Sequence, residues 1–94
     1  MPIAQLGLVL ETAQNPGITQ PELAELAEKF NMHSGTVSRN LKTLSIYVEN
    51  GVRKGFDLIE MRPDLVERRK LACFLTARGA ELVQAIVQTM EVLK

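Results

Sequence analysis

The chain has 94 residues with eleven basic and eleven acidic side chains, and its formal net charge of zero excludes a uniformly basic protein that wraps nucleic acid. Hydrophobic residues make up 46% of the chain, which predicts one small core and one domain over residues 1–94 rather than disorder. With one cysteine and one histidine, an internal disulfide framework and a zinc site of several thiolates are excluded, so we expect no metal and no cofactor.

The distribution of apolar and charged residues predicts where the protein resides. No apolar run approaches the roughly 20 residues of a membrane span, and no basic stretch precedes an apolar one at the start, so we expect no signal peptide, no membrane partner and a cytoplasmic location. The charge is uneven, with a net −3 in residues 1–30, +4 in residues 31–79 and −1 in residues 80–94. This asymmetry is either chance scatter or the mark of a positive surface built by the middle of the chain.

Two helices joined by a short turn are predicted first. Apolar residues recur at helical spacing over residues 2–14, and Asn15-Pro16-Gly17 ends that pattern. Thr19 and Glu22 have the spacing of a capping box at the start of a second helix. With the helix that follows, this segment forms a helix-turn-helix over about residues 19–45.

The third helix, predicted over about residues 34–44, carries the candidate site for reading DNA. At 3.6 residues per turn, Val37, Leu41 and Leu44 share one side, which we expect to be buried. The remaining surface carries small, hydroxyl and cationic side chains and no carboxylate: Ser34, Gly35, Thr36, Ser38, Arg39, Lys42 and Thr43. A solvated helix usually mixes both charge signs, so this surface favours DNA binding; the alternative is an ordinary polar face of a helical bundle.

Strands follow in a hairpin and wing over about residues 46–75. Asn50-Gly51 predicts a tight turn between strands at 46–49 and 52–54. Two further strands are predicted over 56–62 and 68–75, and alternation in the second would place Arg69 on the face of Cys73 and Arg68 on the face of Lys70. The cations of this region are candidate DNA contacts: Arg53, Lys54, Arg62, Arg68, Arg69 and Lys70.

A last helix is predicted over about residues 77–94, with Thr76 as its cap. Its apolar stripe is broader than one small domain needs to bury. The stripe either forms the seam of a homodimer or packs back onto the first helix. The candidate interface residues are Leu82, Ile86, Val87, Met90 and Leu93.

The order of these elements predicts a mainly α fold with a small antiparallel β wing, the layout of a winged helix-turn-helix. Leu23-Ala24-Glu25 and the run from Thr36 to Arg39, with Leu41 and Leu44, resemble the helix-turn-helix of the MarR family of transcription regulators. The wing resembles that family further, because the residues that follow are in register with its pattern: Ile59-Glu60-Met61-Arg62-Pro63-Asp64, Glu67-Arg68-Arg69, Leu75-Thr76 and Gly79. The resemblance covers about residues 18–80.

This resemblance implies binding of duplex DNA as a homodimer. It places Thr36, Ser38 and Arg39 at the major groove or its phosphates, and Arg68 or Arg69 (with Arg62 as the next candidate) at the minor groove. The chain departs from the family in three ways. Glu67 stands where the family usually has aspartate, and the segment between Leu44 and Ile59 is longer, as in compact members from phages and other mobile elements. There is also little room for the terminal helices that form the usual dimer and ligand pocket, so a small-molecule effector is left open.

Three remaining residues have more than one interpretation. Cys73 is expected to be a buried small hydrophobe rather than a redox sensor. His33, at the start of the third helix, is expected to cap it or to contact a phosphate. Tyr47 is expected to pack under the hairpin rather than to stack on a sugar.

The leading hypothesis is a sequence-specific duplex-DNA-binding transcription regulator that acts as a homodimeric repressor. One alternative is a winged-helix protein-interaction module, and another is a plasmid or phage replication or partition factor. We do not expect an enzyme, because the sequence offers no nucleophile–base–acid set, phosphate-binding loop or metal cluster.

Overall fold

The computed structural model describes residues 3–92, except for the side chain of Phe30. In chain order the elements are α1 (Ile3–Gln14), β1 (Ile18–Thr19), α2 (Gln20–Ala27), the 3₁₀ turn η1 (Glu28–Phe30), α3 (Ser34–Leu44), β2 (Tyr47–Glu49), β3 (Val52–Lys54), β4 (Ile59–Pro63), β5 (Leu71–Leu75) and α4 (Ala77–Val92). The predicted fold class, mainly α with a small antiparallel wing, is confirmed.

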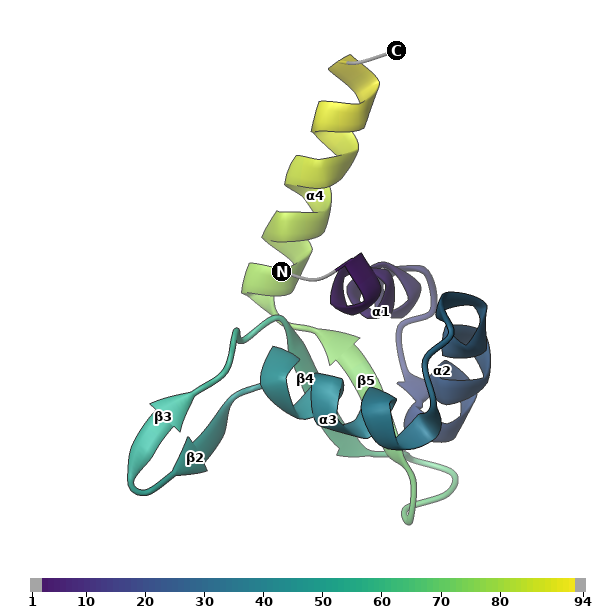
Figure 1. The fold of residues 1–94 in the computed structure, drawn as a ribbon, viewed down its shortest axis with the longest axis vertical. Helices are drawn as coiled ribbons and strands as arrows, with labels where there is room; N and C mark the ends of the chain where they lie inside the picture. The colour runs from purple at the N-terminus through teal and green to yellow at the C-terminus, as the bar shows by residue number, and fades with distance from the viewer. Residues whose placement is uncertain (1–2, 93–94) are drawn as a thin grey trace.

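The strands form two separate antiparallel sheets. β4 and β5 make the wing, and β1 adds to the outer edge of β5 in the order β1-β5-β4, with Ile18 opposite Cys73 and Ile59 opposite Leu75. β2 and β3 pair only with each other. In Figure 1, α3 lies between the β2–β3 hairpin and the loop that joins β4 to β5, on the side of the molecule away from the projecting α4.

The core lies between the first three helices and the three-stranded sheet. Val37, Leu41 and Leu44 of α3 are fully buried, as predicted from their spacing. They join residues of α1, α2 and the sheet in one apolar cluster, among them Leu8 and Leu23. The burial of one side of α3 therefore leaves its carboxylate-free side at the surface.

Short polar contacts set the start of α2 and of α4. One Glu22 carboxylate oxygen accepts hydrogen bonds from the Thr19 hydroxyl (2.6 Å) and the Thr19 backbone N–H (3.2 Å), and these bonds lower the pKa of Glu22. Thr76 caps α4, because its hydroxyl accepts from the Gly79 N–H at 3.0 Å and donates to the Asp57 carbonyl at 2.6 Å. Both predicted caps are present, and the second ties α4 to the segment before the wing.

The predicted strands over 56–62 and 68–75 are too long at their starts. Asp57 has a φ of 55°, and the Leu58 N–H donates to the carbonyl of Leu44 at 2.8 Å, so this segment bonds to the end of α3 instead of to β5. β5 begins only at Leu71, which leaves Arg68, Arg69 and Lys70 in the loop before it. The alternating faces predicted for these three cations are therefore wrong.

Cys73 is fully buried in β5, and burial raises the pKa of its thiol from 9.0 to about 11. Because the folded state favours the neutral thiol, it gains stability that is complete below about pH 9 and is lost as the pH rises toward 11. We expect Cys73→Ala to remove a contribution of roughly 2–3 kcal/mol that varies with pH in this window. Denaturant unfolding of both proteins between pH 8 and 11 should show their stability difference changing with pH. A stability difference that stays constant over this pH range would contradict the raised pKa of Cys73.

Candidate nucleic-acid interface

The surface side of α3 is open and cationic. Ser34, Gly35, Ser38, Arg39 and Lys42 are exposed, whereas Thr36 and Thr43 are half-buried. Arg39 makes one long hydrogen bond, from its Nη2 to the Thr36 hydroxyl at 3.4 Å. At Gly35 no atom lies within 4 Å of the position that a Cβ would take, so another molecule can approach the backbone there. Five of the seven predicted α3 residues are thus exposed, and Thr36 and Thr43 are partly covered.

A polar contact behind α3, which the sequence did not reveal, links this helix to α1. The Gln5 side-chain amide donates to the Asn40 carbonyl oxygen at 2.7 Å, and the Asn40 amide donates to the Thr36 backbone carbonyl at 2.8 Å. Gln5 is buried, so water does not compete for this hydrogen bond. The contact favours one rotation of α3 about its own axis. Gln5 is a polar residue within the apolar first half of α1, which is the hint that the sequence offers.

The β2–β3 hairpin continues the cationic surface at one end of α3. Asn50 and Gly51 have φ values of 53° and 76°, as the predicted tight turn requires. The Lys42 ammonium lies 4.9 Å from the centre of the half-buried Tyr47 ring, which joins the hairpin base to α3. Lys54 lies 3.6 Å from the Glu49 carboxylate, whereas Arg53 is exposed and has no ion pair within residues 3–92.

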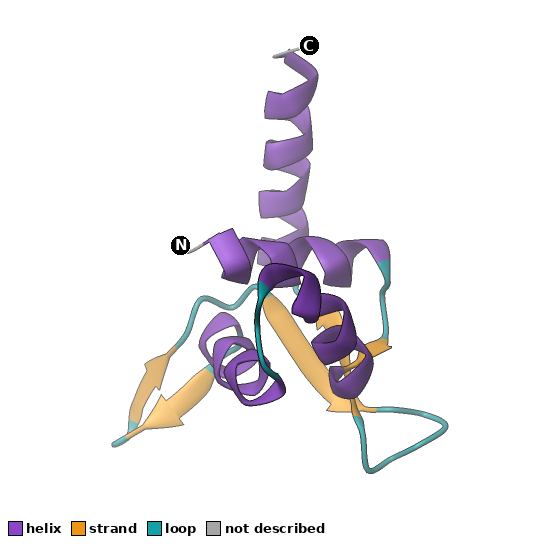
Figure 2. Cartoon of the chain, turned by 45° about the vertical axis from the view of Figure 1, so that its right-hand side comes forward, coloured by secondary structure: helices purple, strands orange, loops and turns teal. Residues whose placement is uncertain are grey.

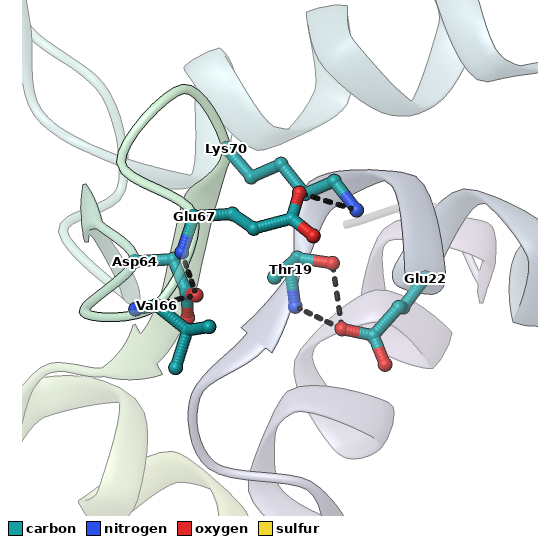
Figure 3. A network of polar contacts seen from close by, with 6 residues as sticks. All are labelled: Thr19, Glu22, Asp64, Val66, Glu67 and Lys70. Carbon is teal, nitrogen blue, oxygen red and sulfur yellow. Dashed lines mark hydrogen bonds and ion pairs between the residues drawn. The ribbon is translucent and has the colours of Figure 1, made fainter.

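The cations of the wing divide into paired and unpaired groups. Arg62 stacks on the Phe74 ring, 4.0 Å from its centre, and lies 3.6 Å from a Glu60 oxygen. The Glu67 carboxylate lies 3.1 Å from the Lys70 ammonium, as Figure 3 shows. Two arginines, Arg68 and Arg69, are exposed and form no ion pair with any residue that the structure describes.

These groups come together on one side of the molecule. A cleft lies between α2, Ser34 at the start of α3, and Arg69 and Lys70 of the β4–β5 loop. Figures 1 and 2 both show one hairpin on each side of α3. α4 extends from the opposite side of the molecule. Arg62 differs from the other predicted DNA-contacting cations, because its guanidinium already contacts the Phe74 ring and the Glu60 carboxylate within its own sheet.

α4 leaves much of its apolar stripe uncovered. Leu82 and Val83 pack against the core and Ile86 is half-buried, but Val87 is 45% and Met90 62% exposed. Leu93 lies outside the described residues. Figure 2 shows α4 extending well beyond α1, so packing onto the first helix accounts only for the start of the stripe.

Three further observations concern metal binding, membrane spans and the cap of α3. Over residues 3–92, no group of three or more histidine, cysteine, aspartate or glutamate side chains is placed to hold a metal ion. None of the helices described is both long and apolar enough to cross a membrane. His33 is exposed and precedes α3, but its side chain makes no capping hydrogen bond.

Comparison with known proteins supports the fold. No family model and no curated protein matches the chain. Among solved structures, the chain is similar to one described as the crystal structure of MarR, with a TM-score of 0.72 and 30% sequence identity. The match covers 97% of this chain and 58% of that one, so the chain spans little more than half of its structural relative. The winged-helix fold is thus MarR-like over nearly the whole chain.

Proposed function

We propose that this MarR-like winged helix is a transcription regulator that binds duplex DNA sequence-specifically as a homodimer and acts as a repressor in the cytoplasm. The proposal rests on the carboxylate-free side of α3, on the cleft between its start and Arg69, and on Arg53 and Arg68, which are exposed on the two hairpins and have no ion pair among residues 3–92. The similarity to a MarR structure supports the same conclusion. We also propose that the protein is a compact member of the phage or mobile-element type, because the β2–β3 hairpin lengthens the segment between α3 and the wing.

The proposed binding mode uses each part of this surface differently. The major groove of B-form DNA admits a helix, and Arg39 is the α3 side chain best suited to a bidentate contact with guanine. Ser34, Thr36, Ser38, Lys42 and Thr43 contribute phosphate or base-edge contacts from the same helix. The hairpin and wing cations bind the phosphate backbone or the minor groove, which adds affinity without reading bases directly.

The homodimer is proposed to form through the uncovered part of α4. Exposed aliphatic side chains on a helix that extends away from the body are the kind of surface that a symmetric partner buries. A two-fold dimer would place its α3 helices in successive major grooves, about 34–36 Å apart. The proposal therefore includes a palindromic site with half-sites one helical turn apart.

The decisive experiment is selection of bound sequences from a random duplex library, followed by gel shifts at low salt. Recovery of one palindromic consensus supports a regulator that reads sequence. Absence of binding to any duplex at micromolar protein would contradict it and favour a protein-docking module. Placing the recovered site upstream of a reporter then tests repression, and an increase in expression would contradict the repressor assignment.

The salt dependence of binding should distinguish the two neighbouring wing cations. We expect Arg69→Ala to weaken all duplex sequences alike and to reduce the slope of log K against log salt by about 1, because one phosphate contact is lost. Lys70→Ala should have a smaller effect, since its ammonium is already paired with Glu67. Titrations from 50 to 200 mM salt measure both slopes.

Lys29→Ala serves as the control for this comparison, because Lys29 pairs with Glu11 of α1 instead of facing the proposed interface. Its slope should match that of the unmodified protein. Equal slopes for the unmodified protein and the three variants would show that the wing loop does not contact phosphates.

A further inference from the structure

We propose that the tip of the wing inserts Leu65 and Val66 into the minor groove of bound duplex DNA and bends the DNA at that point. This inference rests on the proposed DNA-binding function and adds a contact that is apolar. The wing would then contact DNA through inserted aliphatic side chains as well as through its arginines.

Leu65 and Val66 are adjacent, and each is almost completely exposed. Their exposed fractions are 93% and 90%, the highest among the large hydrophobic side chains described. Neither packs against the core cluster. An aliphatic side chain held in water gains about 25 cal/mol for each Å² that a partner later covers. The pair is therefore available to a partner without any rearrangement of the core.

The loop that carries this pair is held in shape by its own hydrogen bonds. The Asp64 carboxylate accepts from the backbone N–H groups of Val66 (3.1 Å) and Glu67 (3.0 Å), as Figure 3 shows. The backbone N–H of Asp64 donates to the Lys70 carbonyl, and that of Lys70 to the Glu67 carbonyl, both at 2.9 Å. A preorganised loop loses less conformational entropy on binding than a mobile one. The aliphatic tip is thus presented in a defined conformation.

The groups around the tip point to duplex DNA as the partner. Arg68 and Arg69 follow the aliphatic pair after Glu67, whose carboxylate pairs with Lys70, and both arginines are exposed with no ion pair among residues 3–92. Arginine favours a narrow minor groove, because the negative potential is concentrated there. The loop and α3 also lie at the same end of the molecule, away from α4, as Figures 1 and 2 show. When α3 occupies the major groove of a duplex, the wing tip would therefore lie close to the same duplex.

Aliphatic side chains inserted into a minor groove act by separating two stacked base pairs. Proteins that insert Leu, Ile, Met, Phe or Pro between base pairs kink the duplex by about 20–90° toward the major groove. Pyrimidine–purine steps such as TA and CA/TG unstack most easily. The wing tip would therefore prefer a pyrimidine–purine step at the position where it inserts. This preference would arise from the ease of unstacking that step, without a hydrogen bond between the protein and the bases.

The test measures DNA bending, with a double-labelled duplex carrying the selected site and energy transfer between its ends. The unmodified protein should bring the ends closer together. Leu65→Ser/Val66→Ser should lose most of that change and about tenfold in affinity, while its salt slope stays the same because no cation is removed. The variant should fold normally, since both side chains lie in water.

A matched control removes a different exposed aliphatic pair on a hairpin. Val48→Thr/Val52→Thr changes side chains that are 70% and 55% exposed on β2 and β3, and it should bend DNA as the unmodified protein does. Binding to the selected site without bending, or bending that survives Leu65→Ser/Val66→Ser, would overturn the inference and leave the DNA-binding function intact. Failure of the unmodified protein to bind any duplex would instead overturn the proposed function, and the inference with it. Tip-dependent binding to phosphatidylserine vesicles without tip-dependent bending would also overturn it, in favour of a lipid surface.

Discussion

The double variant Val87→Glu/Met90→Glu is expected to convert the proposed homodimer into monomers and to lower affinity for a palindromic duplex by about 10²–10⁴-fold. Two linked recognition helices bind the second half-site at a high effective concentration, and this advantage is lost when the subunits separate. Both side chains lie on the uncovered part of the α4 stripe, where a carboxylate would have to be buried in the seam.

Sedimentation or light scattering measures the mass of the variant, and gel shifts compare a palindrome with a single half-site. The control is Ala85→Glu/Gln88→Glu, which adds the same charge at exposed positions on the opposite side of α4. This control should remain dimeric. A Val87→Glu/Met90→Glu protein that keeps its dimer mass would show that α4 is not the seam, and a monomeric unmodified protein would contradict the homodimer itself.

The second large effect is expected at Arg39. Its guanidinium is exposed on α3 and, among the described residues, makes a single 3.4 Å hydrogen bond, so little is lost when it turns toward a base. A bidentate contact with guanine discriminates against other bases by about 1–3 kcal/mol. We therefore expect Arg39→Ala to weaken the best site by about 5–150-fold and to relax the preference at one position of each half-site.

Repeating the sequence selection with Arg39→Ala tests the reading role directly. Arg53→Ala removes the same charge from the β2–β3 hairpin and should weaken all sequences while leaving the consensus unchanged. If Arg39→Ala also recovers the same consensus, Arg39 contacts the backbone and the bases are read by another α3 side chain.

The sequence did not indicate how the arginines divide between paired and unpaired groups. The ring that Arg62 stacks on belongs to the neighbouring strand, at Phe74, and Glu67 meets Lys70 because the loop turns back on itself. Predicting a longer β5 placed Arg68, Arg69 and Lys70 on alternating strand faces. The hydrogen bonds of Asp64 instead close that segment into a loop. β1 was missed because two residues are too few to show a strand periodicity.

The sequence by itself determined the helices, the Asn50-Gly51 turn, the caps at Thr19 and Thr76, and the buried side of α3. Each depends on residues that lie within about one helical turn or one hairpin turn of each other, so local spacing contains the necessary information. Only the tertiary structure decided that α3, the hairpin and the wing loop share one end of the molecule, that Arg68 and Arg69 form no ion pair within residues 3–92, and that Leu65 and Val66 are almost completely exposed. These properties depend on distances between segments far apart in the chain, which packing of the core establishes and local spacing does not encode.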